Sequence, residues 1–416
     1  MQIIKRSDKT FQEKLSAMLD RSAFSDEIES SVREILFEVR SRGDSALCEF
    51  ALKYDSAKLQ PEQFKLSEEE IAEAVKNTPA EVRAAIDCAI QRIKDFSTQQ
   101  LPENWSYNPR KGVTLGEQFS PLDRVGCYIP GGTAPLVSTA AHTIAIAAAA
   151  KVPEIVAITP AGKDGKVNHN LLYACHKAGA SEIYRLGGVY GIAALAYGTE
   201  SIKKVEKIVG PGNAYVTAAK RQVYGHVSLD LVAGPSEILV IADKSANPAY
   251  IAADMLSQAE HGSGKEQAVL LSTDAELLPK VEKELLEQSK RLSRSECLLE
   301  VLQNGVFLIE VKDLQEAVQI ANIYAPEHLE IMCENAPELA KGITSAGGIF
   351  IGEWTPEPVG DFLAGPSHVL PTGGSARFFA GLSVEAFFRR NSIVQYDKAA
   401  LKEDLPYLQI IAACEG

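Results

Sequence analysis

The chain lacks the cysteine pattern of secreted proteins and of thiolate metal sites. Its 416 residues include seven cysteines, which lie far apart and form no Cys-x-x-Cys pair. This spacing argues against a disulfide framework and against a zinc site built from thiolates, and it is typical of proteins in a reducing compartment. We therefore expect a cytoplasmic location.

Long apolar runs are also missing. The first residues, MQIIKRSDKTF, contain no apolar segment of the kind that a secretory signal peptide needs. The longest weakly polar stretch, residues 134–150, is mostly alanine and is interrupted by Pro135 and His142. A membrane span needs about 20 strongly apolar residues, so we expect no membrane partner and interpret residues 134–150 as a buried helix.

Basic residues are fewer than acidic ones. The chain has 42 Lys and Arg against 55 Asp and Glu, a formal net charge of −13. Such a chain repels phosphate backbones, and no concentrated basic segment offsets this, so we expect no nucleic-acid partner. The hydrophobic share of 46% and charged share of 23% are typical of a packed protein, and about 150 residues per domain predicts two or three domains.

Two kinds of pattern follow one another along the chain. Before residue 124 the apolar residues recur at helical spacing, as in residues 26–42, and Ser67 to Glu70 form a capping box. From Arg124 onward, short β-branched runs alternate with helical segments in two series, at 155–159, 183–186, 207–209 and 228–231, then at 238–242, 268–272, 306–310, 328–333 and 349–352. This alternation predicts βα units and parallel sheets.

The predicted fold class is therefore α/β. We expect two tandem Rossmann-like but incomplete modules with parallel sheets, a helical N-terminal segment and a small helical C-terminal tail from Gly381. The expected division is an N-terminal extension at 1–24, one α/β domain from 25–123 plus 237–380, a second α/β domain at 124–236, and a C-terminal dimerisation segment at 381–416.

Three glycine clusters follow predicted strands, at residues 130–132, 187–188 and 210–213. Glycine at the carboxyl end of a strand lets backbone N–H groups approach a phosphate. None of the clusters spells G-x-G-x-x-G or a Walker A loop, so ordinary tight turns remain the alternative to a nucleotide cleft.

The second module carries the polar residues. Gln258 and His261 are three residues apart on a predicted helix, Glu327 and His328 begin a predicted strand, and Asp361 lies in a Gly/Pro-rich loop. An amide oxygen, a neutral histidine and a carboxylate suit zinc or a similar divalent ion, and a Glu–His pair suits proton transfer. Hydrogen-bonded structural histidines and a solvated turn remain the alternatives.

At these residues the sequence resembles the histidinol dehydrogenase family. The matching stretches include RVGCYIPGGTAPL at 124–136, KIVGPGNAYVTAAK at 207–220, LVAGPSEILVIAD at 231–243, LSQAEHG at 256–262, APEHLEI at 325–331 and GPSHVLPTGGSARF at 365–378. The resemblance runs in order from about residue 20 to the last residue. It implies an NAD-dependent four-electron oxidation of L-histidinol to L-histidine through L-histidinaldehyde, the last step of histidine biosynthesis.

The resemblance also implies a role for individual positions. The metal ligands would be Gln258, His261 and Asp361, and one zinc ion per subunit would orient the substrate through its amine and imidazole. The catalytic pair would be Glu327 and His328. His328 would take the alcohol proton as a base, and Glu327 would activate the water that hydrates the aldehyde.

Further positions match family residues that contact the substrate or the cofactor. The substrate contacts would be Ser236, Gln258, His261, His328, Asp361 and Glu415, with Glu415 meeting the amine of histidinol. The NAD contacts would be Tyr128, Tyr190 and Asn213. Tyr190 stands where the family has a glutamine, so the sequence departs from the family pattern at one cofactor contact.

The end of the sequence is a second departure. The family continues beyond Glu415 with a segment that carries a fourth zinc ligand, a histidine, and that reaches the active site of a partner subunit, whereas this sequence stops at Gly416. We expect a homodimer with a swapped C-terminal segment, and either a truncated sequence or a natural relative with an altered metal shell. The alternative function is NAD-dependent oxidation of another amino- or hydroxy-alcohol, and a third reading is a non-enzymatic homologue.

Overall fold

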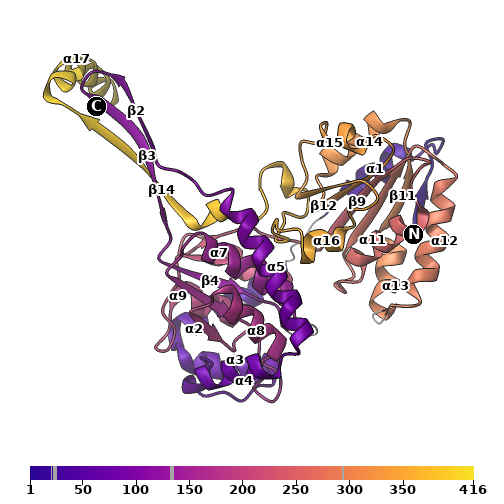
Figure 1. The fold of residues 1–416 in the computed structure, drawn as a ribbon, viewed down its shortest axis with the longest axis horizontal. Helices are drawn as coiled ribbons and strands as arrows, with labels where there is room; N and C mark the ends of the chain where they lie inside the picture. The colour runs from indigo at the N-terminus through magenta and orange to yellow at the C-terminus, as the bar shows by residue number, and fades with distance from the viewer. Residues whose placement is uncertain (20, 22–25, 132–134, 293–294) are drawn as a thin grey trace.

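The structure is a computed structural model that describes residues 1–19, 21, 26–131, 135–292 and 295–416. Two α/β lobes and a projecting arm make up the described chain (Figure 1). One lobe contains a six-stranded sheet, the other a five-stranded sheet, and the arm a three-stranded sheet. The expectation of an α/β fold with two parallel sheets is confirmed.

The six-stranded sheet is parallel throughout. Its strands, in spatial order, are β1 (Gln2–Ile4), β11 (Val306–Glu310), β10 (Gln267–Ser272), β9 (Glu237–Ala242), β12 (His328–Met332) and β13 (Gly348–Ile351). The central strands β9, β10 and β12 are nearly continuous apolar runs because both of their faces are covered. Helices α11 (Pro248–Ala259), α12 (Leu277–Ser289) and α13 (Ser295–Asn304) cover one face. Helices α1 (Phe11–Leu19), α14 (Leu314–Tyr324) and α15 (Ala336–Ala340) cover the other face.

The five-stranded sheet is also parallel. Its strands, in spatial order, are β6 (Glu182–Tyr184), β5 (Glu154–Ile158), β4 (Arg124–Tyr128), β7 (Lys207–Val209) and β8 (Ser228–Leu229). One face packs on α4 (Glu68–Asn77), α5 (Ala80–Thr98), α8 (His169–Ala178) and the alanine-rich segment from α6 (Val137–Ala140) through the π-helical η2 (Ala141–Ala145) to α7 (Ile146–Ala149). The other face packs on α2 (Asp26–Arg42), α3 (Asp44–Asp55), α9 (Gly188–Tyr197) and α10 (Ala214–Val223).

The N-terminal helices belong with the five-stranded sheet. The apolar stripe of α2, which includes Val32, Ile35 and Leu36, is buried against α9 and α10 in one core. This packing differs from the expected grouping of residues 25–123 with 237–380. Sequence periodicity shows which face of a helix is apolar, but not which of two sheets that face will cover. The first residues instead join the six-stranded sheet, because β1 pairs with β11.

The arm is a structure that the sequence did not predict. Strands β2 (Trp105–Arg110), β3 (Val113–Pro121) and β14 (Phe388–Tyr396) form its antiparallel sheet, and α17 (Lys398–Glu415) lies at its tip (Figure 1). The tail from Gly381, expected to be helical, therefore includes a nine-residue strand. That strand forms because it pairs with β3, for example Tyr396 with Val113. Its partner lies more than 260 residues earlier in the chain.

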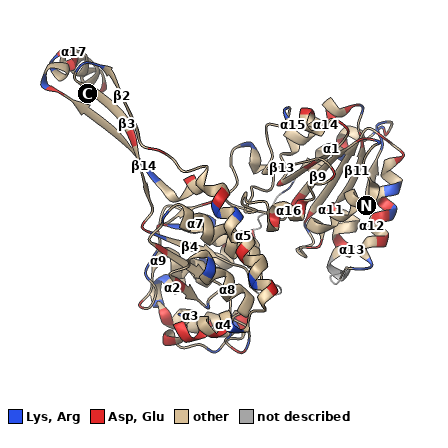
Figure 2. Cartoon of the chain, in the orientation of Figure 1, with Lys and Arg blue, Asp and Glu red and all other residues tan. Residues whose placement is uncertain are grey.

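Charged residues of both signs occur on the helices of both lobes (Figure 2). Among the residues that the structure describes, no helix is long and apolar enough to cross a membrane.

One buried ion pair fixes the turn after β7. Lys220 and Asp230 are both almost fully buried and pair with each other. Lys220 Nζ also donates to the Gly210 carbonyl over 2.8 Å, and the Gly210 N–H donates to Asp230 over 2.7 Å. Gly210 has φ +115°, and a Cβ there would lie 2.2 Å from the Tyr128 carbonyl oxygen. The pair therefore holds a backbone that only glycine can adopt at this close approach.

We expect Lys220→Met to lower the free energy of unfolding by about 3–5 kcal/mol, because it leaves the Asp230 carboxylate buried and unpaired. Arg42→Met is the matched control, since Arg42 pairs with Glu38 and Glu49 at the exposed surface, and it should cost less than about 1 kcal/mol. Denaturant unfolding of both variants measures the difference. A similar small loss of unfolding free energy in both variants would show that the buried pair stabilises the fold no more than the exposed one.

Candidate active site

A cleft of about 1030 Å³ lies between the two lobes, and both contribute to its walls. The five-stranded lobe provides residues at the carboxyl ends of its strands, among them Tyr128, the last residue of β4, and Gly188 after β6. The six-stranded lobe provides Ser236 and Glu327, which precede β9 and β12. One wall thus follows the usual rule for ligands of open α/β sheets, while the other is built at the amino ends of strands.

The glycine clusters lie along the five-stranded wall. Gly131, Gly188 and Gly212 line the cleft, whereas Gly132 lies outside the described residues. The Gly188 N–H donates to the Tyr128 hydroxyl over 3.3 Å. Asn213 caps α10 by accepting hydrogen bonds from the N–H groups of Tyr215 and Val216. The amino ends of α9 and α10 therefore face the cleft, an arrangement that favours an anionic ligand.

Tyr190 lies in the wall of this cleft. Its side chain is almost fully buried, and its hydroxyl donates to the Asp55 carboxylate at the end of α3. Burial raises the pKa of Asp55, and the hydrogen bond from Tyr190 opposes that shift. Asp55 and Tyr190 both line the cleft, so a half-buried carboxylate and a phenol lie together there.

Glu327 and His328 lie on a turn held in an unusual conformation. Helix α14 ends at Tyr324, its C-cap residue Ala325 has φ +50°, and the chain then turns through Pro326 into β12. The Gly348 N–H fixes the turn by donating to the Glu327 carbonyl over 2.8 Å. A left-handed alanine costs about 1–2 kcal/mol, and such strain is common where a structure must aim functional side chains.

The hydrogen bonds of this pair define its chemistry. His328 Nδ1 lies 3.0 Å from the Glu237 carbonyl oxygen. A carbonyl only accepts, so Nδ1 carries a proton, and in the neutral ring Nε2 holds the lone pair. The Glu237 N–H donates to Glu327 Oε2 over 3.0 Å. Both side chains are thus oriented by one backbone residue, Glu237.

Burial and charge shift the proton affinities of both groups. Burial raises the pKa of Glu327 to about 8, although the nearby His328 opposes the shift. Burial alone would lower the pKa of His328, but the carboxylates of Glu327 and Asp361 raise it to about 10. Without a cation the pair therefore retains protons near neutral pH. A metal ion bound beside it would compete with those protons.

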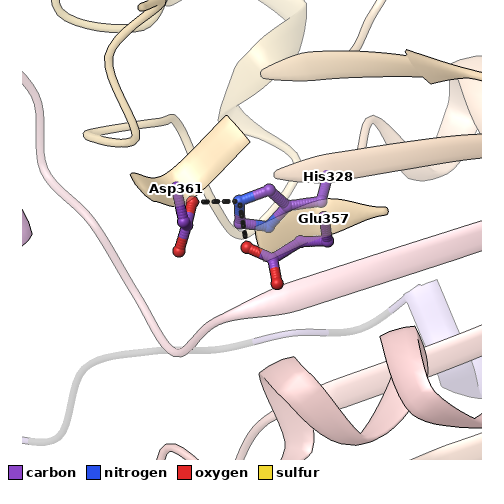
Figure 3. A group of neighbouring side chains, drawn as sticks. All are labelled: His328, Glu357 and Asp361. Atoms are coloured by element: carbon purple, nitrogen blue, oxygen red, sulfur yellow. Dashed lines mark ion pairs between the residues drawn. The ribbon is translucent and has the colours of Figure 1, made fainter. Parts of the chain in front are cut away.

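A cluster of possible metal ligands adjoins the pair. His328 Nε2 lies 3.4 Å from Asp361 Oδ1 and 3.8 Å from Glu357 Oε1 (Figure 3). One ligand atom from each of the three residues lies within 4.8 Å of the others. Glu357 and Asp361 belong to α16 (Glu357–Phe362), and Ser257 Oγ donates to Glu357 Oε2 over 2.6 Å.

The two carboxyl groups of this cluster have pKa values shifted in opposite directions. Burial raises the pKa of Glu357 to about 7, and the Asp361 carboxylate adds to the shift. Burial would also raise the pKa of Asp361, but its contact with the His328 ring holds that pKa well below its usual range. The cluster is acidic and largely buried, as a divalent cation site requires.

The other predicted metal ligands lie nearby on the same lobe. Gln258 is buried on α11, and within the described part of the chain its Oε1 has no hydrogen-bond donor. His261 follows α11 and is exposed, with Nδ1 2.7 Å from the Ser236 hydroxyl oxygen. The close cluster thus contains Asp361 of the predicted set, joined by His328 and Glu357. Glu357 was not predicted from the sequence, although its four-residue spacing from Asp361 on one helix was a usable signal.

Glu415 lies away from the cleft of its own chain. It is the last residue of α17, at the tip of the arm (Figure 1). The residues that line the cleft come from the two lobes, and Glu415 is not among them. Within one chain the structure therefore brings together Ser236 and His261, and separately Glu327, His328 and Asp361, but not Glu415.

The fold and the cleft define a two-lobed α/β enzyme, in which glycine turns at helix ends face a buried Glu–His pair across a space large enough for a nucleotide. The family model described as histidinol dehydrogenase matches residues 19–416. The chain belongs to the histidinol dehydrogenase family. The resemblance seen in the sequence is confirmed, as is the expectation of an oxidoreductase enzyme.

Individual relatives agree with this assignment. Histidinol dehydrogenase of Heliobacterium mobile is 45% identical over 386 residues, which cover 92% of this chain and 90% of the relative. Histidinol dehydrogenase of Caldanaerobacter subterraneus is 47% identical over 375 residues, which cover 90% and 86%. The crystal structure of histidinol dehydrogenase from Elizabethkingia anophelis superposes with a TM-score of 0.93 at 33% identity, covering 100% of this chain and 95% of that one.

Proposed function

We propose that the chain oxidises L-histidinol to L-histidine through L-histidinaldehyde, using two NAD⁺, as the last step of histidine biosynthesis in the cytoplasm. The observation that carries the proposal is the Glu327–His328 pair beside the cleft, in a chain of this family. The six described cysteines are free thiols, which is typical of a reducing compartment.

His328 acts as the base of the first oxidation. Its Nδ1–H is held by the Glu237 carbonyl. Once the second ring proton is lost, as a cation bound beside the ring would favour, Nε2 is the atom that accepts the alcohol proton while a hydride leaves the carbinol carbon. NAD⁺ bound in the cleft would supply the acceptor for that hydride. The products of this step are the aldehyde, NADH and one proton.

Glu327 acts in the second oxidation. Its carboxylate lines the cleft and is anchored by the Glu237 N–H, so it can take a proton from a water that adds to the aldehyde carbon. The hydrated aldehyde would then lose a second hydride to a second NAD⁺ and one hydroxyl proton, which gives the carboxylic acid, NADH and one proton. Because its pKa is raised to about 8, the ionised Glu327 carboxylate is a stronger base than an exposed glutamate.

The cleft is the proposed NAD site. Tyr128 and Asn213 lie at the ends of β4 and α10, where backbone N–H groups face an anionic ligand. Tyr190 contributes to the wall and holds Asp55 beside the same space. We propose all three as cofactor contacts, with the amino ends of α9 and α10 nearest the pyrophosphate.

The acidic cluster fits a zinc ion. Its donor atoms lie close together, and Glu357 Oε1 and Gln258 Oε1 are buried with no hydrogen bond from the described residues. We propose that Gln258, His261 and Asp361 hold the ion and that Glu357 offers a further oxygen. Zinc would supply a Lewis acid that orients the amine and imidazole of histidinol. Ser236 positions the His261 ring through their hydrogen bond and adjoins the substrate.

Turnover tests the proposed reaction. With NAD⁺ and histidinol, the zinc-loaded protein should form two NADH per histidinol. We expect His328→Asn and Glu327→Gln each to lower kcat by about 10²- to 10⁴-fold, because each removes a proton acceptor. Glu334→Gln, an exposed glutamate after the same strand, is the control and should retain full activity. NADH formed only with another amino- or hydroxy-alcohol would contradict the histidinol assignment and support the alternative substrate.

Zinc content tests the metal site. We expect Asp361→Asn, and Ser257→Ala through loss of its bond to Glu357, each to weaken zinc binding by at least about 10-fold. A competition titration against a chromogenic chelator measures the affinity without reference to activity. Glu353→Gln, an exposed acidic residue before α16, should bind zinc as the wild type does. Unchanged affinity in Asp361→Asn would place the metal elsewhere.

Two apolar surfaces support a homodimer. One lies on the arm and consists of Ile393, Val394, Leu401, Leu405, Tyr407, Leu408, Ile410 and Ile411, all exposed. The other lies on β13 and α16 beside the metal cluster and consists of Ile349, Ile351, Trp354, Val359, Phe362 and Leu363, also exposed. Patches of this kind mark interfaces. We propose that the arm of a second copy covers the β13–α16 surface and carries its Glu415 to the substrate.

Subunit complementation tests this exchange. Glu415→Ala leaves its own cleft intact, and His328→Asn leaves its own arm intact, so each should be poorly active alone. Co-expression should give mixed dimers in which one of the two sites is complete, and restore about a quarter of the wild-type activity. The control variant is Leu286→Asp, at an exposed position of α12. It is used in place of Glu415→Ala and should be active without co-expression of a second variant. Failure of the mixed sample to regain activity would contradict the swapped arm.

A further inference from the structure

Both catalytic side chains depend on the peptide groups of a single residue. Glu237 begins β9, its N–H donates to Glu327 Oε2, and its carbonyl accepts from His328 Nδ1, each over 3.0 Å. A displacement of this one residue along the strand would therefore move the proton acceptor of both oxidation steps. What holds Glu237 in place thus bears directly on the reaction.

The side chain of Glu237 is fixed by a residue from the start of the chain. Arg21 Nη1 pairs with Glu237 Oε1 at 2.6 Å, with side-chain exposures of only 8% and 4%. The same oxygen accepts a hydrogen bond from the Gly373 N–H over 3.0 Å. Arg21 is not one of the residues that line the cleft, so it meets neither substrate nor cofactor there.

Arg21 also contacts the segment that carries the catalytic pair. Its guanidinium lies 3.7 Å from the centroid of the Tyr324 ring, and Nη2 donates to the Tyr324 carbonyl. Tyr324 is the last residue of α14 and precedes the left-handed turn at Ala325. One guanidinium therefore bridges the strand that orients the pair and the turn that presents it. Only arginine among the cationic residues offers donors in such a planar fork.

We propose that Arg21 is a positioning residue, which holds the Glu237 peptide at the distance from Glu327 and His328 that the proposed oxidation requires. The inference rests on the proposed function, because it assigns those two residues to proton transfer. A buried ion pair is a weak source of net stability, whereas a misplacement of about 1 Å in a catalytic group can cost about 100-fold in rate. We therefore expect the Arg21–Glu237 ion pair to contribute more to the reaction rate than to the net stability of the fold.

The chain contains a matched control for this contact. Arg6 lies in the same N-terminal segment, pairs with Glu316, and has its guanidinium 5.1 Å from the centroid of the Phe11 ring. It too links residues near the start of the chain to the six-stranded lobe, but its contacts do not include Glu237 or the Glu327–His328 turn. Removing it tests the effect of loosening the segment alone.

Steady-state kinetics of the zinc-loaded full chain with histidinol and NAD⁺ test the proposal. We expect Arg21→Met to lower kcat by about 100-fold. Both KM values should stay within about threefold of the wild type, because Arg21 does not line the cleft in which substrate and cofactor would bind. Arg6→Met should retain kcat. Arg21→Lys keeps the charge without the fork and should give an intermediate kcat. A wild-type kcat in a folded Arg21→Met, or equal losses in Arg21→Met and Arg6→Met, would overturn the proposal.

A double variant separates positioning from stability. Arg21→Met/Glu237→Gln removes both buried charges and keeps an oxygen for the Gly373 N–H, so its Tm should recover toward that of the wild type while kcat remains low. Recovery of kcat together with Tm would overturn the positioning role and leave a structural one. An inactive wild type would overturn the proposed function along with this inference, whereas an active wild type with an unaffected double variant would overturn the inference alone.

Discussion

The active site depends on the parallel pairing of β9 with β12. In that pairing His328 lies opposite Ile238, so the peptide of Glu237 stands within hydrogen-bond distance of both Glu327 and His328. Buried polar groups are costly unless each finds a partner. The register satisfies this requirement for the pair with backbone groups, and it leaves Nε2 of the histidine directed at the carboxylates of α16.

The two lobes contribute opposite ends of their strands to one cleft. The five-stranded lobe presents carboxyl ends and the amino ends of helices, which suit a phosphate-bearing ligand. The six-stranded lobe presents the amino ends of β9 and β12, where a left-handed residue and a buried acidic cluster suit proton transfer and a cation. Dinucleotide and substrate would thus meet between lobes, and each lobe specialises in one kind of recognition.

The arm has a different physical basis from the lobes. Its antiparallel sheet and α17 expose apolar side chains. Contact between such a surface and water is unfavourable in free energy, and exposed apolar patches often mark interfaces. A second exposed apolar surface lies on β13 and α16, and in the proposed homodimer it is covered by the arm of the second copy. The position of Glu415 at the tip of this arm means that its proposed contact with substrate depends on assembly.

The sequence by itself determined the α/β class, most strand positions and the location of Glu327 and His328 at the start of a strand, because hydrophobic periodicity and family motifs are local features of the chain. It did not reveal that α2–α5 cover the five-stranded sheet, that β14 pairs with β3, or that Glu357 joins Asp361 and His328. Each of these depends on contacts between distant segments. Only the tertiary structure brings Arg21 to Glu237 across more than 200 residues, because a single arginine in a sequence carries no sign of the buried carboxylate that it will meet.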